Sequence, residues 1–273
     1  MPDQPSVALH DGHVMPQFGL GVWQTPDGDA PAVIRSALSA GYRLVDTAAV
    51  YGNERGVGRG LRSAGRDGVY VTTKLWNDRQ GYDSALKAFD ESLEKLELDY
   101  IDLYLIHWPV PKQDRYVDSW KALIELQRSG RTRSIGVSNF TVDNLERLIG
   151  ETGVVPVVNQ IELHPAFQQK ELRAFHASKG IATESWSPLG RGATLTDPTI
   201  VAIARKHGRT PAQVVIRWHL DLGLVVIPKS VQPERIRENI DVFGFKLDED
   251  DHARIAALDS PGGRAGPDPA NFS

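Results

Sequence analysis

The chain contains no cysteine, which excludes disulfide bonds, thiolate metal ligands and a cysteine nucleophile. It also has no apolar run that approaches the roughly 20 residues of a membrane-spanning helix. The first residues, Met-Pro-Asp-Gln-Pro-Ser, lack the basic and apolar regions of a signal peptide. We therefore expect a cytoplasmic protein without a membrane partner.

A large net charge of either sign is missing as well. The formal net charge is −4 at pH 7, which argues against a broad nucleic-acid-binding surface. A local group of cations around a phosphate remains compatible with that value. We expect no nucleic-acid partner and no bound metal. The hydrophobic fraction, 41% of 273 residues, is ordinary and allows a full buried core.

Short runs rich in Val and Ile alternate along the chain with longer stretches of helical period. The predicted strands are residues 17–22, 43–47, 69–75, 101–107, 133–138, 157–162, 183–188 and 224–228. The predicted helices are residues 31–40, 54–63, 83–96, 119–129, 142–149, 170–179, 198–207 and 233–240. This repeated alternation predicts parallel strands joined by crossover helices.

We predict a single (β/α)₈ TIM barrel domain over residues 1–273, because no linker divides the chain and a barrel needs roughly 250 residues. Asp11 and Gly12, between two short β-prone runs, predict an N-terminal β-hairpin. A doubly wound dinucleotide fold is the alternative and would need G-x-G-x-x-G after its first strand. The run from Gly19 lacks the third glycine, and the glycines of residues 56–60 have the wrong spacing inside a predicted helix.

Reactive side chains end several of the predicted strands, where barrel enzymes carry their chemistry. Asp46 ends the second strand and precedes Tyr51, Lys74 ends the third, and His107 ends the fourth. Taken singly, these residues have ordinary interpretations: Asp46 as a turn residue, Tyr51 as a packing aromatic and His107 as a structural histidine. A lysine at the end of an apolar strand needs an anionic partner, and Asp46 is the nearest candidate. The combination on consecutive strands indicates an active site.

The four residue types together suit the reduction of a carbonyl group, which takes a hydride at carbon and a proton at oxygen. Tyr51 would donate the proton, although a free tyrosine has a pKa of about 10. The Lys74 ammonium would lower that pKa, and Asp46 would orient the lysine. His107 would hydrogen-bond the substrate oxygen.

The sequence resembles the aldo-keto reductase superfamily over nearly its whole length. The matching segments are residues 15–21, 46–54, 74–76, 102–109, 136–140 and 227–230, in family order and at family spacing. Residues 184–190, Glu-Ser-Trp-Ser-Pro-Leu-Gly, are similar to the bacterial 2,5-diketo-gluconate reductases. The resemblance implies a monomer that reduces aldehydes, ketones or dicarbonyls with NADPH. A non-catalytic NADP(H)-binding regulatory protein and a barrel enzyme with Lys74 as a Schiff base are the alternatives.

The resemblance also implies a cofactor site. Trp186 would stack on the nicotinamide, and the carboxamide would be hydrogen-bonded by Ser138, Asn139 and Gln160, whose side chains offer donors and acceptors. The 2′-phosphate would lie at a helix start after the last strand, a ready anion site, held by Lys229, Ser230 and Arg235. The adenine would be contacted by Glu238 and Asn239. Further cofactor contacts are expected at Gly21, Leu189, Ile227 and Val231.

Tryptophans are expected to form the walls of the substrate pocket. Trp23, Trp76 and Trp108 would surround the substrate beside His107, which suits small or apolar carbonyl compounds. Their ordinary structural interpretation is packing in the core. Residues 110–118 and the Gly/Pro-rich residues 259–273 are short, which implies a more open pocket than in relatives that bind steroids or bulky aldehydes.

Overall fold

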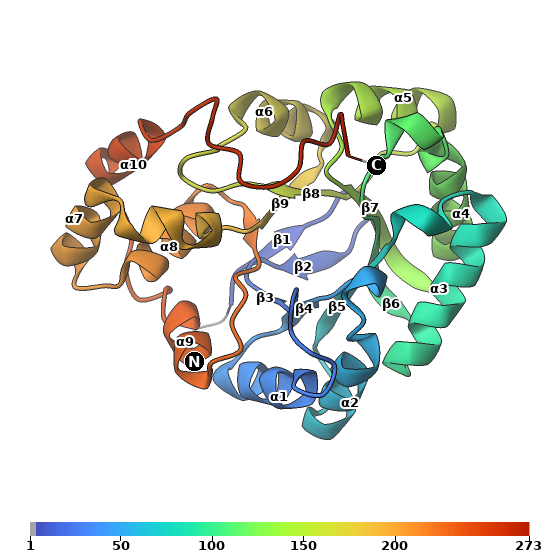
Figure 1. Cartoon of the computed structure of the whole chain (residues 1–273), viewed down its shortest axis with the longest axis horizontal. Helices are drawn as coiled ribbons and strands as arrows, with labels where there is room; N and C mark the ends of the chain where they lie inside the picture. The colour runs from blue at the N-terminus through green and yellow to red at the C-terminus, as the bar shows by residue number, and fades with distance from the viewer. Residues whose placement is uncertain (1–3, 273) are drawn as a thin grey trace.

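A computed structural model describes residues 4–272 and shows a closed barrel of eight parallel strands (Figure 1). In sheet order they are β3 (Leu20–Gly21), β4 (Leu44–Asp46), β5 (Tyr70–Leu75), β6 (Ile101–Ile106), β7 (Thr132–Ser138), β8 (Val158–Glu162), β9 (Ala182–Trp186) and β10 (Val225–Val226). Parallel bridges from Phe18 to Val226 and from Gly21 to Lys229 close the barrel. The predicted (β/α)₈ fold is confirmed. The predicted domain spans residues 1–273, and its residues 1–3 and 273 lie outside the described range.

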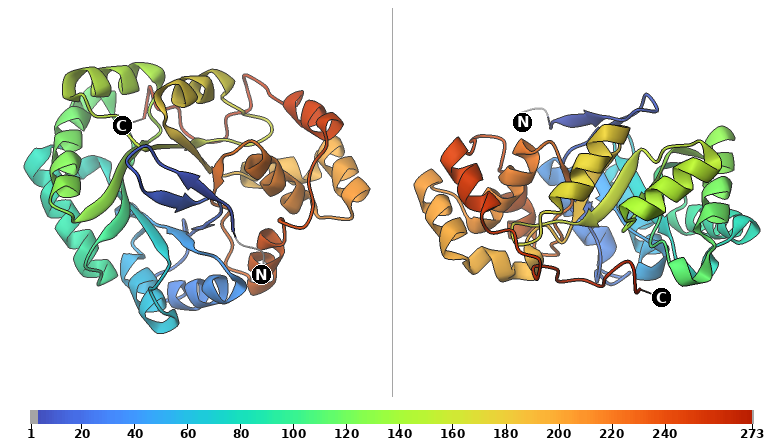
Figure 2. Two further views of the ribbon diagram at one scale, coloured as in Figure 1. Left: turned by 180° about the vertical axis from the view of Figure 1, so that it is seen from behind. Right: turned by 90° about the horizontal axis from the view of Figure 1, so that it is seen from above.

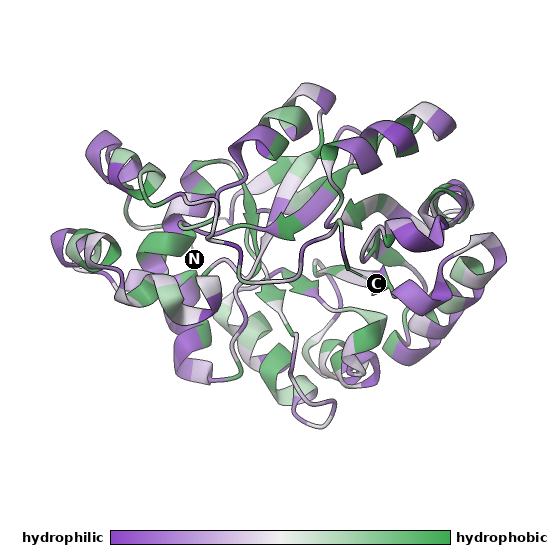
Figure 3. Cartoon of the chain, turned by 45° about the horizontal axis from the view of Figure 1, so that its top comes forward, coloured by the Kyte–Doolittle hydropathy of each residue, from purple (hydrophilic) through white to green (hydrophobic). Residues whose placement is uncertain are grey.

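Helices surround the strands and turn their apolar sides inward (Figure 3). They are α1 (Ala30–Ala40), α2 (Glu54–Ala64), α3 (Tyr82–Leu96), α4 (Tyr116–Arg128), α5 (Val142–Thr152), α6 (Lys170–Lys179), α7 (Pro198–His207), α8 (Pro211–Asp221), α9 (Pro233–Ile240) and α10 (Glu249–Ala256). Short 3₁₀ helices are η1 (Ala49–Tyr51), η2 (Asn77–Arg79), η3 (Pro111–Gln113) and η4 (Gly190–Thr196). Within residues 4–272, no helix has the length and apolar character needed to cross a membrane.

Two helices, α8 and α10, were not predicted from the sequence. The helix α8 packs on β10 and α9, so it completes the barrel between β9 and β10, whereas α7 packs against α8 and α10. Its buried run of β-branched residues and Trp218 is equally typical of a strand. The missed start signal was Thr210, which forms a capping box with Gln213 around a proline at the first turn.

The N-terminal hairpin closes one end of the barrel. Strands β1 (Ser6–Ala8) and β2 (Val14–Pro16) pair antiparallel, as predicted. Leu9 and Met15 pack with Leu44 and Leu103 in a buried cluster at that end. The hairpin and the C-terminal tail lie on opposite ends of the barrel (Figure 2, right). The carboxyl ends of the strands therefore face the tail.

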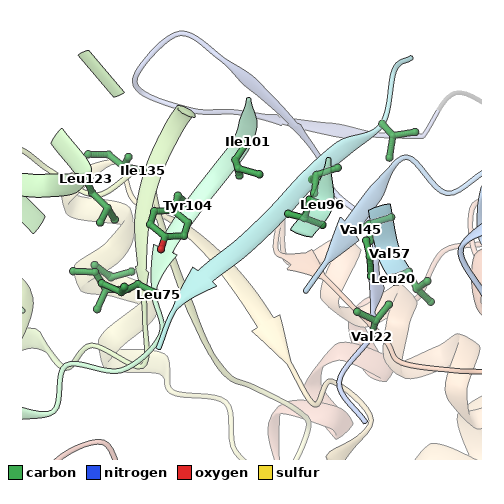
Figure 4. Close-up of a cluster of buried hydrophobic side chains, with 14 of the residues drawn as sticks. Leu20, Val22, Val45, Val57, Leu75, Leu96, Ile101, Tyr104, Leu123 and Ile135 are labelled. Carbon is green, nitrogen blue, oxygen red and sulfur yellow. The ribbon is translucent and has the colours of Figure 1, made fainter. Parts of the chain in front are cut away.

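The main core lies between the strands and their covering helices (Figure 4). Here α2 approaches α1 closely, since a Cβ on Gly60 would lie 2.7 Å from Cβ of Ile34. A Cβ on Gly58 would meet the backbone of Leu96. The glycines of residues 56–60 therefore serve helix packing, in agreement with their predicted place inside a helix.

Candidate active site

A buried ion pair joins the ends of two neighbouring strands. Lys74 on β5 has no solvent exposure, and its Nζ donates to Asp46 Oδ1 on β4 at 2.6 Å and to the Thr47 carbonyl at 2.9 Å. Burial lowers the pKa of Lys74, but Asp46 and Tyr51 raise it more, so its pKa lies above the usual value. The predicted partnership of Lys74 with Asp46 is present, and the lysine stays charged.

Tyr51 stands over this ion pair. The 3₁₀ helix η1 follows β4 directly and places the Tyr51 ring centroid 5.3 Å from Lys74 Nζ. Burial raises the pKa of Tyr51, and Lys74 opposes that effect only in part, so the net shift is upward. Lys74 lowers the pKa of Tyr51 as expected, but desolvation, which the sequence did not reveal, raises it more. Tyr51 therefore carries its proton at neutral pH.

His107 follows β6 and faces both aromatic neighbours edge-on. Its ring centroid lies 5.8 Å from that of Tyr51 and 5.1 Å from that of Trp76. Burial, together with the Lys74 charge, holds the pKa of His107 well below its usual value. A neutral imidazole has one N–H donor and one acceptor, so His107 can donate to a substrate oxygen.

Gln160 on β8 uses both amide hydrogens toward the barrel centre. Its Nε2 donates to Asp46 Oδ2 at 2.8 Å and to Glu184 Oε2 at 2.9 Å. Gln160 also lines the cavity at the ends of the strands. Because the nitrogen is fully used, the side-chain carbonyl is the group that remains for a ligand.

Asn139 has a left-handed backbone, with φ +64°, at the end of β7. Its Nδ2 donates to the His107 carbonyl at 3.0 Å, and its Oδ1 accepts from Trp186 Nε1 at 2.8 Å. Ser138 Oγ donates to the main-chain carbonyl of Gln160 at 2.7 Å. These hydrogen bonds connect the carboxyl ends of β6, β7, β8 and β9 to one another around the cavity.

A cavity of about 470 Å³ opens above these groups. The predicted site residues that line it are Gly21, Trp23, Asp46, Tyr51, Trp76, His107, Trp108, Ser138, Asn139, Gln160, Trp186, Ile227 and Lys229. Lys74 lies beneath it, buried against Asp46. The predicted residues that do not line it are Leu189, Ser230, Val231, Arg235, Glu238 and Asn239. Ser230 and Val231 lie in the segment between β10 and α9, and Arg235, Glu238 and Asn239 lie on α9.

That segment forms a cationic surface next to the cavity. Lys229 lies at the cavity edge, and Arg235 is exposed on α9. Arg209 pairs with Asp241, the residue that follows α9. Lys229 and Arg235 take part in none of the ion pairs among residues 4–272. Glu238 is fixed by Thr210 Oγ1, which donates to it at 2.8 Å. The arrangement offers free positive charge at the start of α9, where the helix dipole also favours an anion.

The C-terminal tail supplies cavity residues that sequence analysis missed. The Phe272 ring centroid lies 4.2 Å from Trp108 and 6.3 Å from Trp76, and Pro267 also lines the cavity. The tail therefore covers part of the pocket. The sequence signal that could have identified Phe272 as a cavity residue was its position as an aromatic side chain in a Gly/Pro-rich segment.

Glu162 anchors this tail at the end of β8. Its carboxylate accepts from the amides of Ala265 at 2.6 Å and Gly266 at 2.9 Å, and His164 Nε2 lies 3.0 Å away. Burial raises the pKa of Glu162, but these partners lower it more, so it stays ionised.

Sequence analysis also missed Arg191, which lines the cavity. It lies 5.8 Å from the half-exposed Trp23 ring, in η4. It brings another positive charge to the cavity wall.

Comparisons with known proteins agree with this geometry. A family model described as the Aldo/keto reductase family matches residues 15–260. A protein named aldo-keto reductase from Mycobacterium sp. (strain KMS) is 56% identical over 271 residues, covering 98% of each chain. Methylglyoxal reductase DkgA of Escherichia coli (strain K12) is 56% identical over 270 residues, covering 97% of each chain.

Solved structures are similar over almost the whole chain. A variant of Gox0644 in complex with NADPH has a TM-score of 0.97 and 57% identity, covering 99% of each chain. MGS-M4, an aldo-keto reductase from a Medee basin deep-sea metagenome library, has a TM-score of 0.95 and 41% identity, covering 98% of this chain and 100% of that chain.

Proposed function

Because the chain belongs to the aldo/keto reductase family, we propose that Asp46, Tyr51, Lys74 and His107 carry out its reaction. The protein is an NADP-dependent oxidoreductase that reduces carbonyl compounds with NADPH. The observation that carries the residue assignment is the buried Lys74–Asp46 ion pair beneath a protonated Tyr51, which opens on the cavity.

The residues fit NADPH, which supplies the hydride when bound. The cations Lys229 and Arg235, which pair with no carboxylate among residues 4–272, suit the 2′-phosphate, and Ser230 follows Lys229 just before α9. The side-chain carbonyl of Gln160 suits the amide hydrogens of a carboxamide, and Ser138 and Asn139 lie beside Gln160. These charged and amide groups are chemically matched to the two ends of the cofactor.

The remaining cofactor assignments rest on position. Trp186 lines the cavity beside Asn139 and presents an aromatic face to a nicotinamide ring. The other proposed contacts, along the path from the cavity to α9, are Gly21, Leu189, Ile227, Val231, Glu238 and Asn239. A Cβ on Gly21 would lie 3.0 Å from the Ile227 main-chain carbonyl oxygen, so glycine allows the close packing of these two segments.

Tyr51 donates a proton to the substrate oxygen, and its neighbours prepare it for that step. Lys74 stabilises the phenolate that remains, since it lies against the ring and keeps its charge. Asp46 holds the lysine in place through the 2.6 Å bond. His107 donates an N–H to the same oxygen and thereby fixes the carbonyl next to Tyr51.

Small carbonyl compounds are the proposed substrates. The walls Trp23, Trp76 and Trp108, closed on one side by Phe272, leave an aromatic cavity suited to a dicarbonyl such as methylglyoxal. The name of the relative DkgA supports this class. We further propose a single barrel domain that works as a cytoplasmic monomer.

Steady-state oxidation of NADPH tests this function. The purified chain should turn over methylglyoxal and phenylglyoxal, with a higher kcat/KM for NADPH than for NADH. Binding of NADPH without turnover of any carbonyl in a broad panel would contradict it and favour the non-catalytic cofactor-binding alternative. Trapping of a covalent adduct on Lys74 by borohydride would favour the Schiff-base alternative.

A further inference from the structure

A second carboxyl group lies inside the barrel beside the Asp46–Lys74 pair. Glu184 on β9 is fully buried, and its Oε2 accepts a hydrogen bond from Gln160 Nε2 at 2.9 Å. The same nitrogen donates to Asp46 Oδ2 at 2.8 Å. The Gln160 amide group therefore connects the carboxylate of Asp46, which the proposed mechanism uses, to the carboxyl group of Glu184, which it does not use.

The charges around Glu184 do not balance if it ionises. Lys74 is the cation that faces it, and the hydrogen bonds of Lys74 go to Asp46 and the Thr47 carbonyl. Glu184 Oε1 is buried and has no hydrogen-bond partner within residues 4–272. Two buried carboxylates with one ammonium would leave an uncompensated charge, which is costly in a low-dielectric interior.

The other titratable groups facing Glu184 do not change this result. Tyr51 on η1 and Tyr70 on β5 are close enough to interact with its charge, and neither is a cation. Burial and Asp46 raise the pKa of Glu184 to about 8, against the opposing effects of Gln160 and Lys74. Glu184 is therefore a neutral acid at pH 7 and becomes an anion in mildly alkaline solution.

We propose that Glu184 is a positioning residue of the reductase. Through the shared Gln160 amide, Glu184 holds Asp46 in place and directs the Gln160 side-chain carbonyl at the nicotinamide carboxamide. The inference rests on the proposed function of Gln160 and Asp46. With both hydrogens of Nε2 bound inside the barrel, the Gln160 side chain cannot flip, so its carbonyl faces the cavity. Without Glu184, one of the two hydrogens is released, and Asp46 alone then holds the Gln160 amide.

The neutral state of Glu184 also has a consequence for cofactor binding. The nicotinamide ring is neutral in NADPH and positively charged in NADP⁺. An ionised Glu184, one hydrogen bond away from the ring's carboxamide site, would attract the oxidised ring selectively. Keeping Glu184 protonated at pH 7 removes this preference and favours binding of the reduced cofactor.

Cofactor dissociation constants measured from pH 6.5 to 9.5 test the inference without catalysis. In the wild-type chain, the ratio of the Kd of NADP⁺ to that of NADPH should fall at least threefold as pH rises through about 8. In E184Q, which mimics the neutral acid, the ratio should stay constant. The phosphate titrations of the two cofactors are the same and cancel in the ratio. An E184Q ratio that follows the wild-type curve would overturn the inference.

The matched control is Glu54 on α2. It is also buried with a raised pKa, but it accepts from Thr73 Oγ1 at 2.7 Å and has no bond to Gln160 or Asp46 among the described residues. E54Q should leave the pH dependence of the Kd ratio unchanged. If E54Q flattens the curve as E184Q does, the effect belongs to the fold and not to Glu184.

Activity separates this inference from the proposed function. E184Q should keep kcat within about twofold of wild type at pH 7, whereas E184A should lose about tenfold and bind NADPH several-fold more weakly. Equal loss in E184Q and E184A would contradict a neutral Glu184. If the wild-type chain is inactive on every carbonyl compound, the proposed function fails. If it is active and E184A matches it, the inference alone fails.

Discussion

Lys74 holds a full positive charge where no water reaches it. The 2.6 Å bond to Asp46 compensates that charge, and Tyr51 lies against its other side. A buried charge that loses its partner is strongly destabilising, so these residues act as one unit. Tyr51 is buried as well, and burial disfavours its phenolate, so its pKa is shifted upward although Lys74 opposes the shift.

Tyr51→Phe should lower kcat by at least about 100-fold, in the range of general acid catalysis, because the ring remains and only the proton donor is lost. NADPH binding, measured by fluorescence titration, should be nearly unchanged. Retention of most of the activity on methylglyoxal would show that another group supplies the proton.

Lys74→Met should cause a comparable loss of kcat, because the phenolate loses its stabilising ammonium. Melting temperature and NADPH affinity serve as controls for the fold. A variant whose pH–rate profile and rate equal those of wild type would disprove the assigned role.

Arg235→Ala should weaken NADPH binding by about 1.5–3 kcal/mol, the scale of one charge-assisted hydrogen bond. NADH lacks the 2′-phosphate, so its Kd should hardly change. Arg237→Ala is the matched control, since Arg237 is a second exposed arginine on another face of α9. Equal weakening of both cofactors by Arg235→Ala would mean that Arg235 supports the segment and does not read the phosphate.

At the scale of elements, the C-terminal tail is the part that shapes the pocket. Glu162 fixes its backbone by two amide hydrogen bonds, and Phe272 then lies against Trp108. The anchor is local to the end of β8, where the substrate cavity opens. A short tail that is well anchored therefore covers part of the cavity.

Phe272→Ala should raise KM for phenylglyoxal roughly two- to tenfold, because an aromatic contact of about 0.5–1.5 kcal/mol is lost. Methylglyoxal has no ring to stack, so its KM should change less than twofold. Steady-state kinetics on both substrates decide the matter. Equal changes for the two substrates would indicate that Phe272 closes the tail without contacting the substrate.

At the scale of the whole molecule, the barrel closes where two short strands meet. Strands β3 and β10 have two residues each, and Gly19 N bonds the Val226 carbonyl at 2.9 Å across the seam. A Cβ on Gly19 would lie 2.5 Å from Leu44 Cγ. The seam therefore depends on a residue without a side chain.

Gly19→Ala should destabilise the barrel by about 1–3 kcal/mol through overpacking. At roughly 2–4 °C per kcal/mol for a chain of this size, calorimetry should resolve the lower melting temperature. Gly150→Ala is the opposite control, since this exposed helical glycine has open space around it and should gain about 0.5–1 kcal/mol. A wild-type melting temperature for Gly19→Ala would mean that the seam adjusts freely.

The sequence by itself determined the barrel and the proposed chemistry. Eight alternating apolar and helical segments predicted the strand order, since the period of each segment is a local property. The chain positions of Asp46, Lys74 and His107 at strand ends predicted their meeting, because parallel strands in a barrel bring these ends to one face. The buried partnership of Lys74 and Asp46 followed from the cost of an unpaired buried charge.

Only the tertiary structure decided the features that depend on distant neighbours. The helix α8 forms because Trp218 and its β-branched neighbours are buried against the barrel, which overrides their strand preference. The upward pKa shift of Tyr51, the bridge from Gln160 to Glu184 and the place of Phe272 all depend on three-dimensional packing. Desolvation and contact act through space, so residues far apart in the chain set them together.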